Sequence, residues 1–98
     1  MTAMHDLRGF QRDLLFVVRG LVEPNGQEIR RELEQTLGAE VQQSRLYSNL
    51  NDLIDAGLLE KSQLNGRTNR YTLTREGERV IESRHEWERQ HLEPAEPS

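Results

Sequence analysis

The sequence predicts an α+β domain that is mainly helical, with three helices, a two-stranded hairpin and a last helix. Three observations predict it. Apolar residues recur at helical spacing in three stretches before residue 57. The Asn65-Gly66 pair, a strong tight-turn signal, then separates two short strand-like segments. Thr74 precedes a long, charged segment and is suited to cap a helix. A chain of 98 residues fits one compact domain.

Apolar residues at helical spacing predict the first helix, over about residues 7–21. They are Leu7, Phe10, Leu14, Val17, Val18 and Leu21. Leu15 and Phe16 fall outside this stripe, so the helix is apolar on more than one side. In so small a protein we expect the second side, with Leu15 and Phe16, to face another chain. Residues 1–6 are expected to be flexible.

The second helix is expected over about residues 26–37. Asn25 and Glu28 form a capping-box pattern at its start, with Asn in place of the usual Ser or Thr. Gly38 offers a left-handed cap at its end. The third helix begins near Gln43 or Ser44 and closes at Gly57. Its outward side is polar and rich in hydrogen-bonding groups near its start.

The segment 58–64 is predicted to be a strand, 67–69 to continue the loop after the turn, and 70–73 to be a second strand. Thr74 is expected to cap a helix over about residues 75–92. Val80, Arg84, Trp87 and His91 lie on one side of that helix. The polar, Pro-rich segment 93–98 is expected to be a disordered tail.

The composition excludes several classes of function. Only 34% of the residues are hydrophobic and 31% are charged, so the core is thin. The chain has no cysteine, which rules out disulfides, a thiol switch and a Cys-ligated metal. Oligomerisation is the remaining means of stabilising a small core. No Gly-rich phosphate loop occurs and the three histidines are scattered, so we expect no enzyme activity, metal or cofactor. With no apolar run of membrane length and no signal peptide, a cytoplasmic location is expected.

The net charge of −4 hides a local pattern. Residues 42–75 carry five basic and three acidic side chains, whereas the segments on either side are net acidic. The sign of the local charge, more than the net charge of the chain, decides how a charged partner is steered. Of the 13 basic residues, 12 are Arg and only Lys61 is Lys. Few lysines and many carboxylates suit a salt-rich cytoplasm, although a high-GC genome would produce the same Arg bias.

This order of elements is that of a winged helix-turn-helix, here spanning residues 7–74. A polar third helix fits the ~12 Å major groove of DNA, and a basic hairpin can reach a flanking phosphate or the minor groove. We therefore expect a set of DNA-binding residues in the third helix and the hairpin. They are Gln42, Gln43, Ser44, Arg45, Tyr47, Ser48, Asn49, Arg67, Thr68, Asn69 and Arg70. Asp52 and Asp55 would repel phosphate, which limits contact to the first half of the helix.

The last helix, 75–92, is expected to be a dimerisation helix, because it has few large apolar residues and little reason to be stable alone. The expected interface residues, from the first and last helices, are Leu15, Phe16, Val80, Arg84, Trp87 and His91. The alternative to a DNA-binding regulator is a protein-interaction module that kept the winged-helix shape without DNA binding. The net charge favours that alternative, and the local positive charge of residues 42–75 favours DNA.

Four segments together resemble the PadR-type winged-helix regulators. They are residues 25–29, 45–50, 56–60 and 66–74 followed by Gly77. The start 10–15 and the Arg84-x-x-Trp87 spacing are similar to members from halophilic archaea. The resemblance implies a homodimeric transcription factor, usually a repressor, whose last helix pairs with the first at the dimer interface. Asn25 departs from the family, in which His is common at this position.

Overall fold

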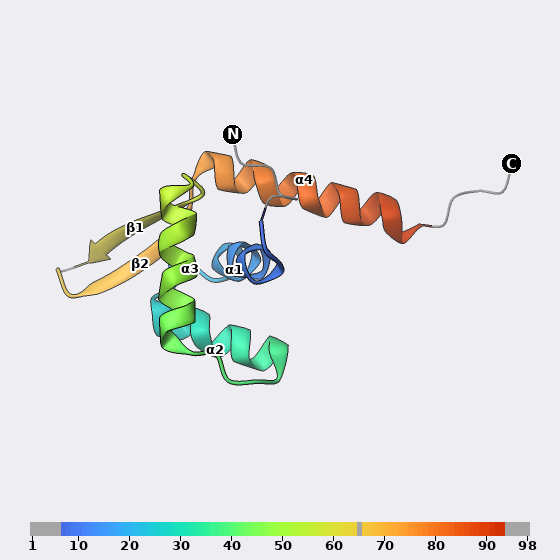
Figure 1. Cartoon of the computed structure of the whole chain (residues 1–98). Coiled ribbons are helices and arrows are strands. Elements are labelled where there is room, and N and C mark those ends of the chain that lie inside the picture. The colour runs from blue at the N-terminus through green and yellow to red at the C-terminus, as the bar shows by residue number, and fades with distance from the viewer. Residues whose placement is uncertain (1–6, 65, 94–98) are drawn as a thin grey trace, which may run out of the picture.

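The computed structural model describes residues 7–64 and 66–93. Within these ranges the elements are α1 (Gly9–Gly20), α2 (Gly26–Leu37), α3 (Gln43–Asp55), β1 (Leu59–Leu64), β2 (Thr68–Leu73) and α4 (Arg75–Leu92) (Figure 1). The two strands form one antiparallel sheet. The predicted α+β, mainly helical class is confirmed. The prediction of a flexible segment 1–6 falls outside the described residues, and so does the predicted disordered tail over 93–98 except for Glu93.

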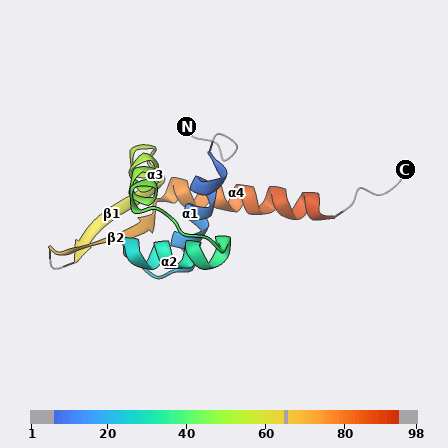
Figure 2. The same ribbon diagram turned by 60° about the horizontal axis from the view of Figure 1, so that its bottom comes forward.

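Helix α1 lies at the centre of the fold, in contact with α2, α3, α4 and β2 (Figure 2). Leu14 and Leu15, in its middle, are both completely buried. The prediction that Leu15 faces another chain is therefore wrong. The second apolar side of α1 is covered by the chain's own elements, and only Phe16 remains exposed. Helical periodicity shows how wide an apolar surface is, but not which neighbours cover it.

Local capping signals set the bounds of α2 as predicted. The Asn25 side chain accepts from the Glu28 backbone N–H at 2.8 Å, and the Asn25 N–H donates to Glu28 Oε1 at 2.9 Å. This is the reciprocal capping box. Gly38 ends the helix with a φ of 67°, the left-handed conformation that glycine adopts without strain. Both predicted caps of α2 are confirmed.

The hairpin is longer than the sequence indicates. Its register runs from Leu59 opposite Leu73 to Leu64 opposite Thr68. Thr68 and Asn69 therefore belong to β2, and the prediction that they continue the loop is wrong. Because β1 extends to Leu64, the antiparallel register brings these residues into the ladder. Residue 65 of the predicted turn lies outside the described residues, and Gly66 has a left-handed φ of 67°.

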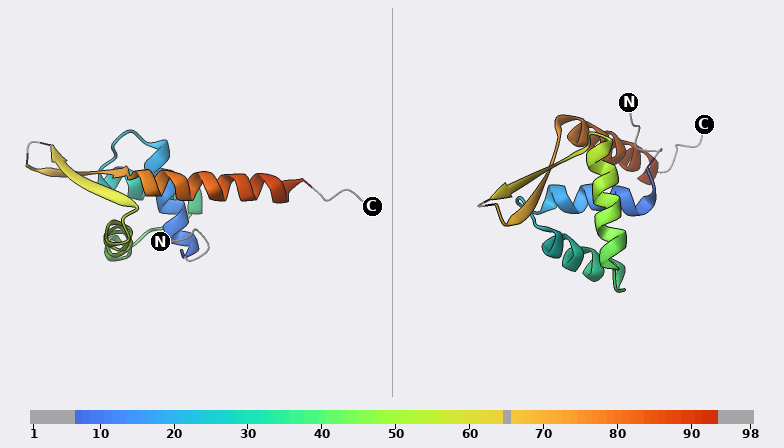
Figure 3. Two further views of the ribbon diagram at one scale, coloured as in Figure 1. Left: turned by 90° about the horizontal axis from the view of Figure 1, so that it is seen from above. Right: turned by 60° about the vertical axis from the view of Figure 1, so that its left-hand side comes forward.

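The hairpin and α4 project from the body in opposite directions (Figures 1 and 3). Helix α3 comes forward together with the hairpin on one side of the molecule, in the right-hand view of Figure 3. The Tyr71 N–H donates to the Pro24 carbonyl at 3.0 Å and ties the hairpin to the α1–α2 connection. The fold thus presents two separated surfaces, one built on α3 and the hairpin and the other on α4.

Three backbone segments meet where the hairpin joins α4. The Thr74 N–H donates to the Leu58 carbonyl at 3.1 Å, and the Thr74 hydroxyl donates to the Gly57 carbonyl at 2.6 Å. The same hydroxyl accepts from the Gly77 N–H at 3.0 Å, which is the predicted N-cap. Gly77 is buried, and a Cβ there would clash with the Leu58 carbonyl oxygen.

We expect Gly77→Ala to lower the free energy of unfolding by about 1–3 kcal/mol, because the obstructing atom is backbone and is held by Thr74. Gly20→Ala is the matched control, since a Cβ at Gly20 has no heavy atom within 4 Å. It should leave stability unchanged or raise it by up to about 1 kcal/mol. Urea denaturation of both variants measures the difference. Equal stabilities would contradict the close approach at Gly77.

Candidate nucleic-acid interface

The first half of α3 presents polar side chains to solvent. The predicted residues that are exposed here are Gln42, Gln43, Ser44, Arg45 and Ser48. Gln42 is the N-cap residue, so the four that follow it occupy the first two turns. Asp52 and Asp55 are exposed further along the helix. The structure therefore brings the neutral and basic groups together at the start of α3 and places the acidic groups toward its end, as the sequence indicates.

Arg45 stacks on an aromatic ring of α1. Its guanidinium carbon lies 3.9 Å from the centroid of the Phe10 ring. Within the described part of the chain, no carboxylate lies within ion-pair distance of this guanidinium. A guanidinium over a ring gains a cation–π attraction while its N–H groups point outward in its own plane. Arg45 is thus held against the body with its donors available.

Asn49 does not reach the outer surface. Only 9% of the residue is exposed, and its side chain is engaged on both sides. Gln11 Nε2 donates to Asn49 Oδ1 at 3.1 Å, and Asn49 Nδ2 donates to the Arg45 carbonyl at 2.8 Å. The prediction that Asn49 contacts DNA is therefore wrong. A polar residue in a helix predicts an outward-facing side chain, but here Asn49 accepts a hydrogen bond from the buried Gln11 across the α1–α3 contact.

Tyr47 is half-buried and lies over the start of α2. A Cβ on Gly26 would clash with the Tyr47 hydroxyl, so this arrangement needs a residue without a side chain at position 26. A cleft of about 380 Å³ opens beside it, between the start of α2 and the hairpin. Asn25, Gln27, Arg67 and Thr68 are among its lining residues. The first N–H groups of a helix lack partners within it and favour an anion, although here the Glu28 carboxylate at the same helix start offsets part of that field.

Tyr71 forms the inner wall of the same cleft. Burial raises the pKa of the Tyr71 phenol above its ordinary value, and Tyr47 adds to the rise while a hydrogen bond from Asn69 lowers it. Because the ordinary value is already near 10, the Tyr71 hydroxyl stays protonated at neutral pH. The cleft wall is therefore an uncharged donor and does not repel an anion.

The hairpin carries two arginines, Arg67 and Arg70, whose surroundings differ. Arg67 is exposed in the turn between β1 and β2. Thr68 is exposed at the start of β2, and Asn69 is half-buried and accepts from Gln63 Nε2 at 3.1 Å. Arg67 and Thr68 remain candidates for contact with a ligand, whereas the Asn69 side chain holds the hairpin together.

Arg70 is not part of the hairpin tip. One of its guanidinium nitrogens donates to Glu28 Oε1 at 3.0 Å and to the Glu23 carbonyl at 3.3 Å. The prediction that Arg70 contacts DNA stays a prediction, and in this structure its charge is paired with the carboxylate that caps α2. This contact fastens the base of the hairpin to the start of α2.

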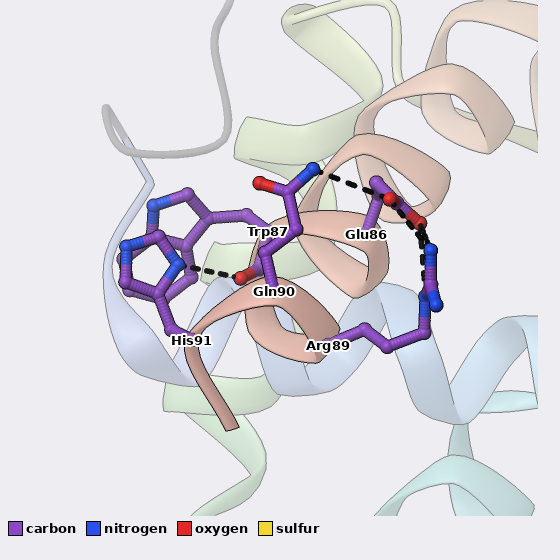
Figure 4. Close-up of polar contacts among 5 residues, drawn as sticks. All are labelled: Glu86, Trp87, Arg89, Gln90 and His91. Carbon is purple, nitrogen blue, oxygen red and sulfur yellow. Dashed lines mark hydrogen bonds and ion pairs between the residues drawn. The ribbon is translucent and has the colours of Figure 1, made fainter. Parts of the chain in front are cut away.

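The second predicted set of residues lies on α1 and α4. Val80 is buried in the chain's own core, so the prediction that it lies at a dimer interface is wrong. From Glu82 to the end of α4 no residue is buried. Arg84 lies over the Trp87 ring at 4.4 Å, and the rings of Trp87 and His91 stack at 4.2 Å. Figure 4 shows this stack and the Glu86–Arg89 pair on the neighbouring side of the helix.

Trp87 remains 47% exposed and Leu92 81% exposed. Beside them, α1, α2 and α4 enclose a groove of about 610 Å³. Phe16, Val17 and Leu33 supply apolar lining, and Arg84 and Glu88 close the α4 side. Of the predicted interface residues, Phe16, Arg84, Trp87 and His91 therefore lie on or beside one accessible surface.

Sequence reasoning missed the residues that hold the interface in place. Apolar spacing predicts only that Phe10 is an apolar position, and it gives Gln11 and Gly26 no role beyond their segments. The capping pattern predicts the role of Glu28 at the start of α2 but not its pairing with Arg70. The family-like segments that contain them were the available signal, because neither periodicity nor capping rules report contacts between distant elements.

The described residues contain no group of three or more His, Asp or Glu side chains placed to hold a metal. No helix among them is long and apolar enough to cross a membrane.

The geometry can be compared with that of known proteins. The model of the transcriptional regulator PadR-like family matches residues 14–83, which is most of the chain. The chain belongs to the PadR-like family of transcriptional regulators. The winged-helix expectation is thereby confirmed, and regulators of this family are not enzymes. The match includes α3, the hairpin and the first turns of α4.

Solved structures of similar chains agree with this membership. RosR from H. salinarum is 42% identical, with a TM-score of 0.86 over 93% of this chain and 82% of that one. PadR from Bacillus subtilis, solved with operator DNA, is 25% identical, with a TM-score of 0.66 over 93% of this chain and 50% of that one. F93 from STIV, at 21% identity and a TM-score of 0.71, covers 83% of this chain and 88% of that one and shows the fold alone. No curated protein sequence matches this regulator.

We expect Asn49→Ala to lower the free energy of unfolding by about 1–3 kcal/mol, because it leaves the Gln11 amide buried without its acceptor. Ser48→Ala, the exposed neighbour, is the matched control and should change stability by less than about 0.5 kcal/mol. Thermal and urea unfolding measure both. If Asn49→Ala is as stable as the wild type, the buried contact with Gln11 contributes nothing.

Proposed function

We propose that this regulator binds operator DNA as a homodimer, with the start of α3 in the major groove and the hairpin against the flanking backbone or minor groove. The observation that carries the proposal is that α3, with its exposed polar residues and Arg45, and the hairpin, with exposed Arg67, lie on one side of the molecule. The relative from Bacillus subtilis, whose structure contains operator DNA, supports DNA binding. The major groove of DNA is ~12 Å wide and admits one helix, which is what α3 would supply.

Each part of the surface has a role in this proposal. Gln43, Ser44 and Ser48 offer donors and acceptors to base edges or phosphates, and Arg45 suits a guanine edge or a phosphate. Tyr47 and the cleft at the start of α2 would receive a backbone phosphate, because helix N-termini favour anions. Arg67 would follow the backbone outward along the hairpin. The exposed Asp52 and Asp55 limit close approach to the first half of α3.

The homodimer is supported by the state of α4. No residue in the second half of α4 is buried. The polar contacts there are pairs within the helix, such as the ion pair of Arg84 with Glu88 at 3.2 Å. Such pairs contribute little, and short helices without tertiary packing are marginal in water. A second copy would cover Trp87 and Leu92 and fill the groove beside Phe16. Two-fold symmetry would then present two α3 helices to successive turns of the DNA.

Repression is the mode of regulation we propose, since a DNA-bound dimer acts most simply by occupying an operator and blocking transcription. The location proposed for it is the cytoplasm, where its DNA target would be found. The protein-interaction module is the outcome favoured if no DNA is bound.

The experiment that tests the proposal is selection of bound fragments from sheared genomic DNA, at low and at molar salt, followed by sequencing. We expect a few loci that share an inverted repeat, with half-sites about one helical turn apart. Recovery of no DNA, or of every fragment at low salt only, would contradict sequence-specific binding. A search for a protein partner would follow from that result.

We expect Arg67→Ala to weaken binding to all DNA sequences by about tenfold at moderate salt, because a charged phosphate contact is lost. The slope of log affinity against log salt should become shallower by about one for each contact removed. Arg79→Ala is the matched control, because Arg79 is exposed on α4 and paired with Glu76 at 2.7 Å. Fluorescence anisotropy over a salt series measures both. Identical slopes in the two variants would remove Arg67 from the interface.

We expect Trp87→Ala to raise the dimer dissociation constant by at least tenfold, because large aromatic side chains dominate interfaces. Leu37→Ala is the matched control, since Leu37 is 45% exposed at the end of α2 and lies outside the groove. Sedimentation of each variant over a dilution series measures association. The single tryptophan also provides a wild-type check, because its emission should shift to the red as the dimer dissociates. An unchanged spectrum through dissociation would contradict burial of Trp87 between copies.

A further inference from the structure

The start of α3 is joined to α1 by an ordered series of hydrogen bonds. The Arg8 N–H donates to Gln11 Oε1 at 3.3 Å, and Gln11 Nε2 donates to Asn49 Oδ1 at 3.1 Å. Asn49 Nδ2 then donates to the Arg45 carbonyl at 2.8 Å. In both side-chain amides, of Gln11 and of Asn49, the oxygen accepts one hydrogen bond and the nitrogen donates one. The series therefore sets the rotation of α3 about its own axis relative to α1.

A second contact acts on the Arg45 side chain itself. The Phe10 ring, next to Gln11 on α1, lies under the guanidinium at 3.9 Å. Phe10 is half-buried and packed against the core, so the ring is a fixed platform rather than a mobile surface group. Arg45 itself is exposed. Stacking uses the face of the guanidinium and leaves its in-plane N–H groups for another partner.

We propose that Phe10 is a positioning residue for DNA recognition: its ring holds the Arg45 guanidinium in the orientation in which it contacts DNA. The Gln11–Asn49 pair fixes the backbone from which Arg45 projects. This inference rests on the proposed function and adds to it a residue outside the surface that touches DNA. It explains why an apolar ring lies beside the first turn of a polar helix.

The physical basis is preorganisation. A free arginine side chain loses rotamer freedom when it binds, and that loss weakens association. A ring that already restricts the side chain reduces the loss, provided that the restricted orientation is the bound one. The gain should appear in binding to the selected sequence, where the direction of the guanidinium matters, and should be small in non-specific binding, where any approach to phosphate suffices.

The test uses a duplex enriched by the wild-type protein from random sequence, with an unrelated duplex of equal length as the non-specific probe. Phe10→Leu keeps an apolar side chain and removes the ring, and Phe10→Tyr restores a ring. We expect Phe10→Leu to weaken binding to the enriched duplex by roughly 2- to 6-fold per protomer, the range of an exposed cation–π contact. Binding to the unrelated duplex should change by less than about 2-fold, and Phe10→Tyr should bind as the wild type does.

A double-mutant cycle separates positioning from a general structural effect. In the Arg45→Ala background, Phe10→Leu should cause no further loss, because the ring then has no guanidinium to hold. Additive losses would overturn the proposal, as would unchanged affinity of Phe10→Leu for the enriched duplex. Unfolding curves of each variant exclude a loss of folded protein as the cause.

A measurement without DNA tests the contact itself. In the wild type, NMR should show the Arg45 side-chain protons shifted upfield by the ring current of Phe10, and Phe10→Leu should abolish the shift. Absence of the shift in the wild type would overturn the proposal regardless of DNA. If the wild type enriches no duplex, the proposed function fails and this inference fails with it. If the wild type binds and only the cycle is additive, the inference alone fails.

Discussion

Helix α1 is the element on which the rest of the molecule depends. It contacts α2, α3, α4 and β2, and its central residues Leu14 and Leu15 are completely buried. Only 34% of the residues are hydrophobic, so the core is built from few apolar side chains. Those of α1 pack against several elements at once. The same helix carries Gln11 toward α3 and Phe16 toward the groove beside α4. The two surfaces of this regulator are therefore both built against a single central helix.

Ion pairs between charged side chains link elements of the fold in addition to the small core. Arg70 joins the base of the hairpin to Glu28, and Arg19 joins α1 to Glu78 of α4 at 3.1 Å. Exposed pairs of this kind each contribute little to stability, and added salt weakens them further. Their value here is in geometry, because each one links two elements that would otherwise be connected only through the core. The preference for Arg over Lys fits this use, since a guanidinium can reach two acceptors at once, as Arg70 does.

The sequence was sufficient to predict the structure where the interactions that determine it are local. The ends of α2 follow from Asn25, Glu28 and Gly38, and the start of α4 follows from Thr74, because these caps act within a few residues. It was insufficient where a side chain meets a distant element. Leu15 and Asn49 both lie opposite residues far away in the chain, and residue type alone assigned each of them to the wrong environment. The exposed start of α3 was predictable because helix periodicity and polar residue type agree there, as at Gln43, Ser44 and Ser48.

The uncovered half of α4 has a consequence for how strongly the regulator responds to its own abundance. If a second copy completes this surface, as proposed above, the active species is a dimer formed from two chains. At concentrations below the dissociation constant of the dimer, the amount of dimer rises with the square of the amount of chain. Occupancy of a target would then change more steeply than the level of the protein does. A modest change in synthesis or degradation of the chain would act as a threshold, without any ligand being needed to produce it.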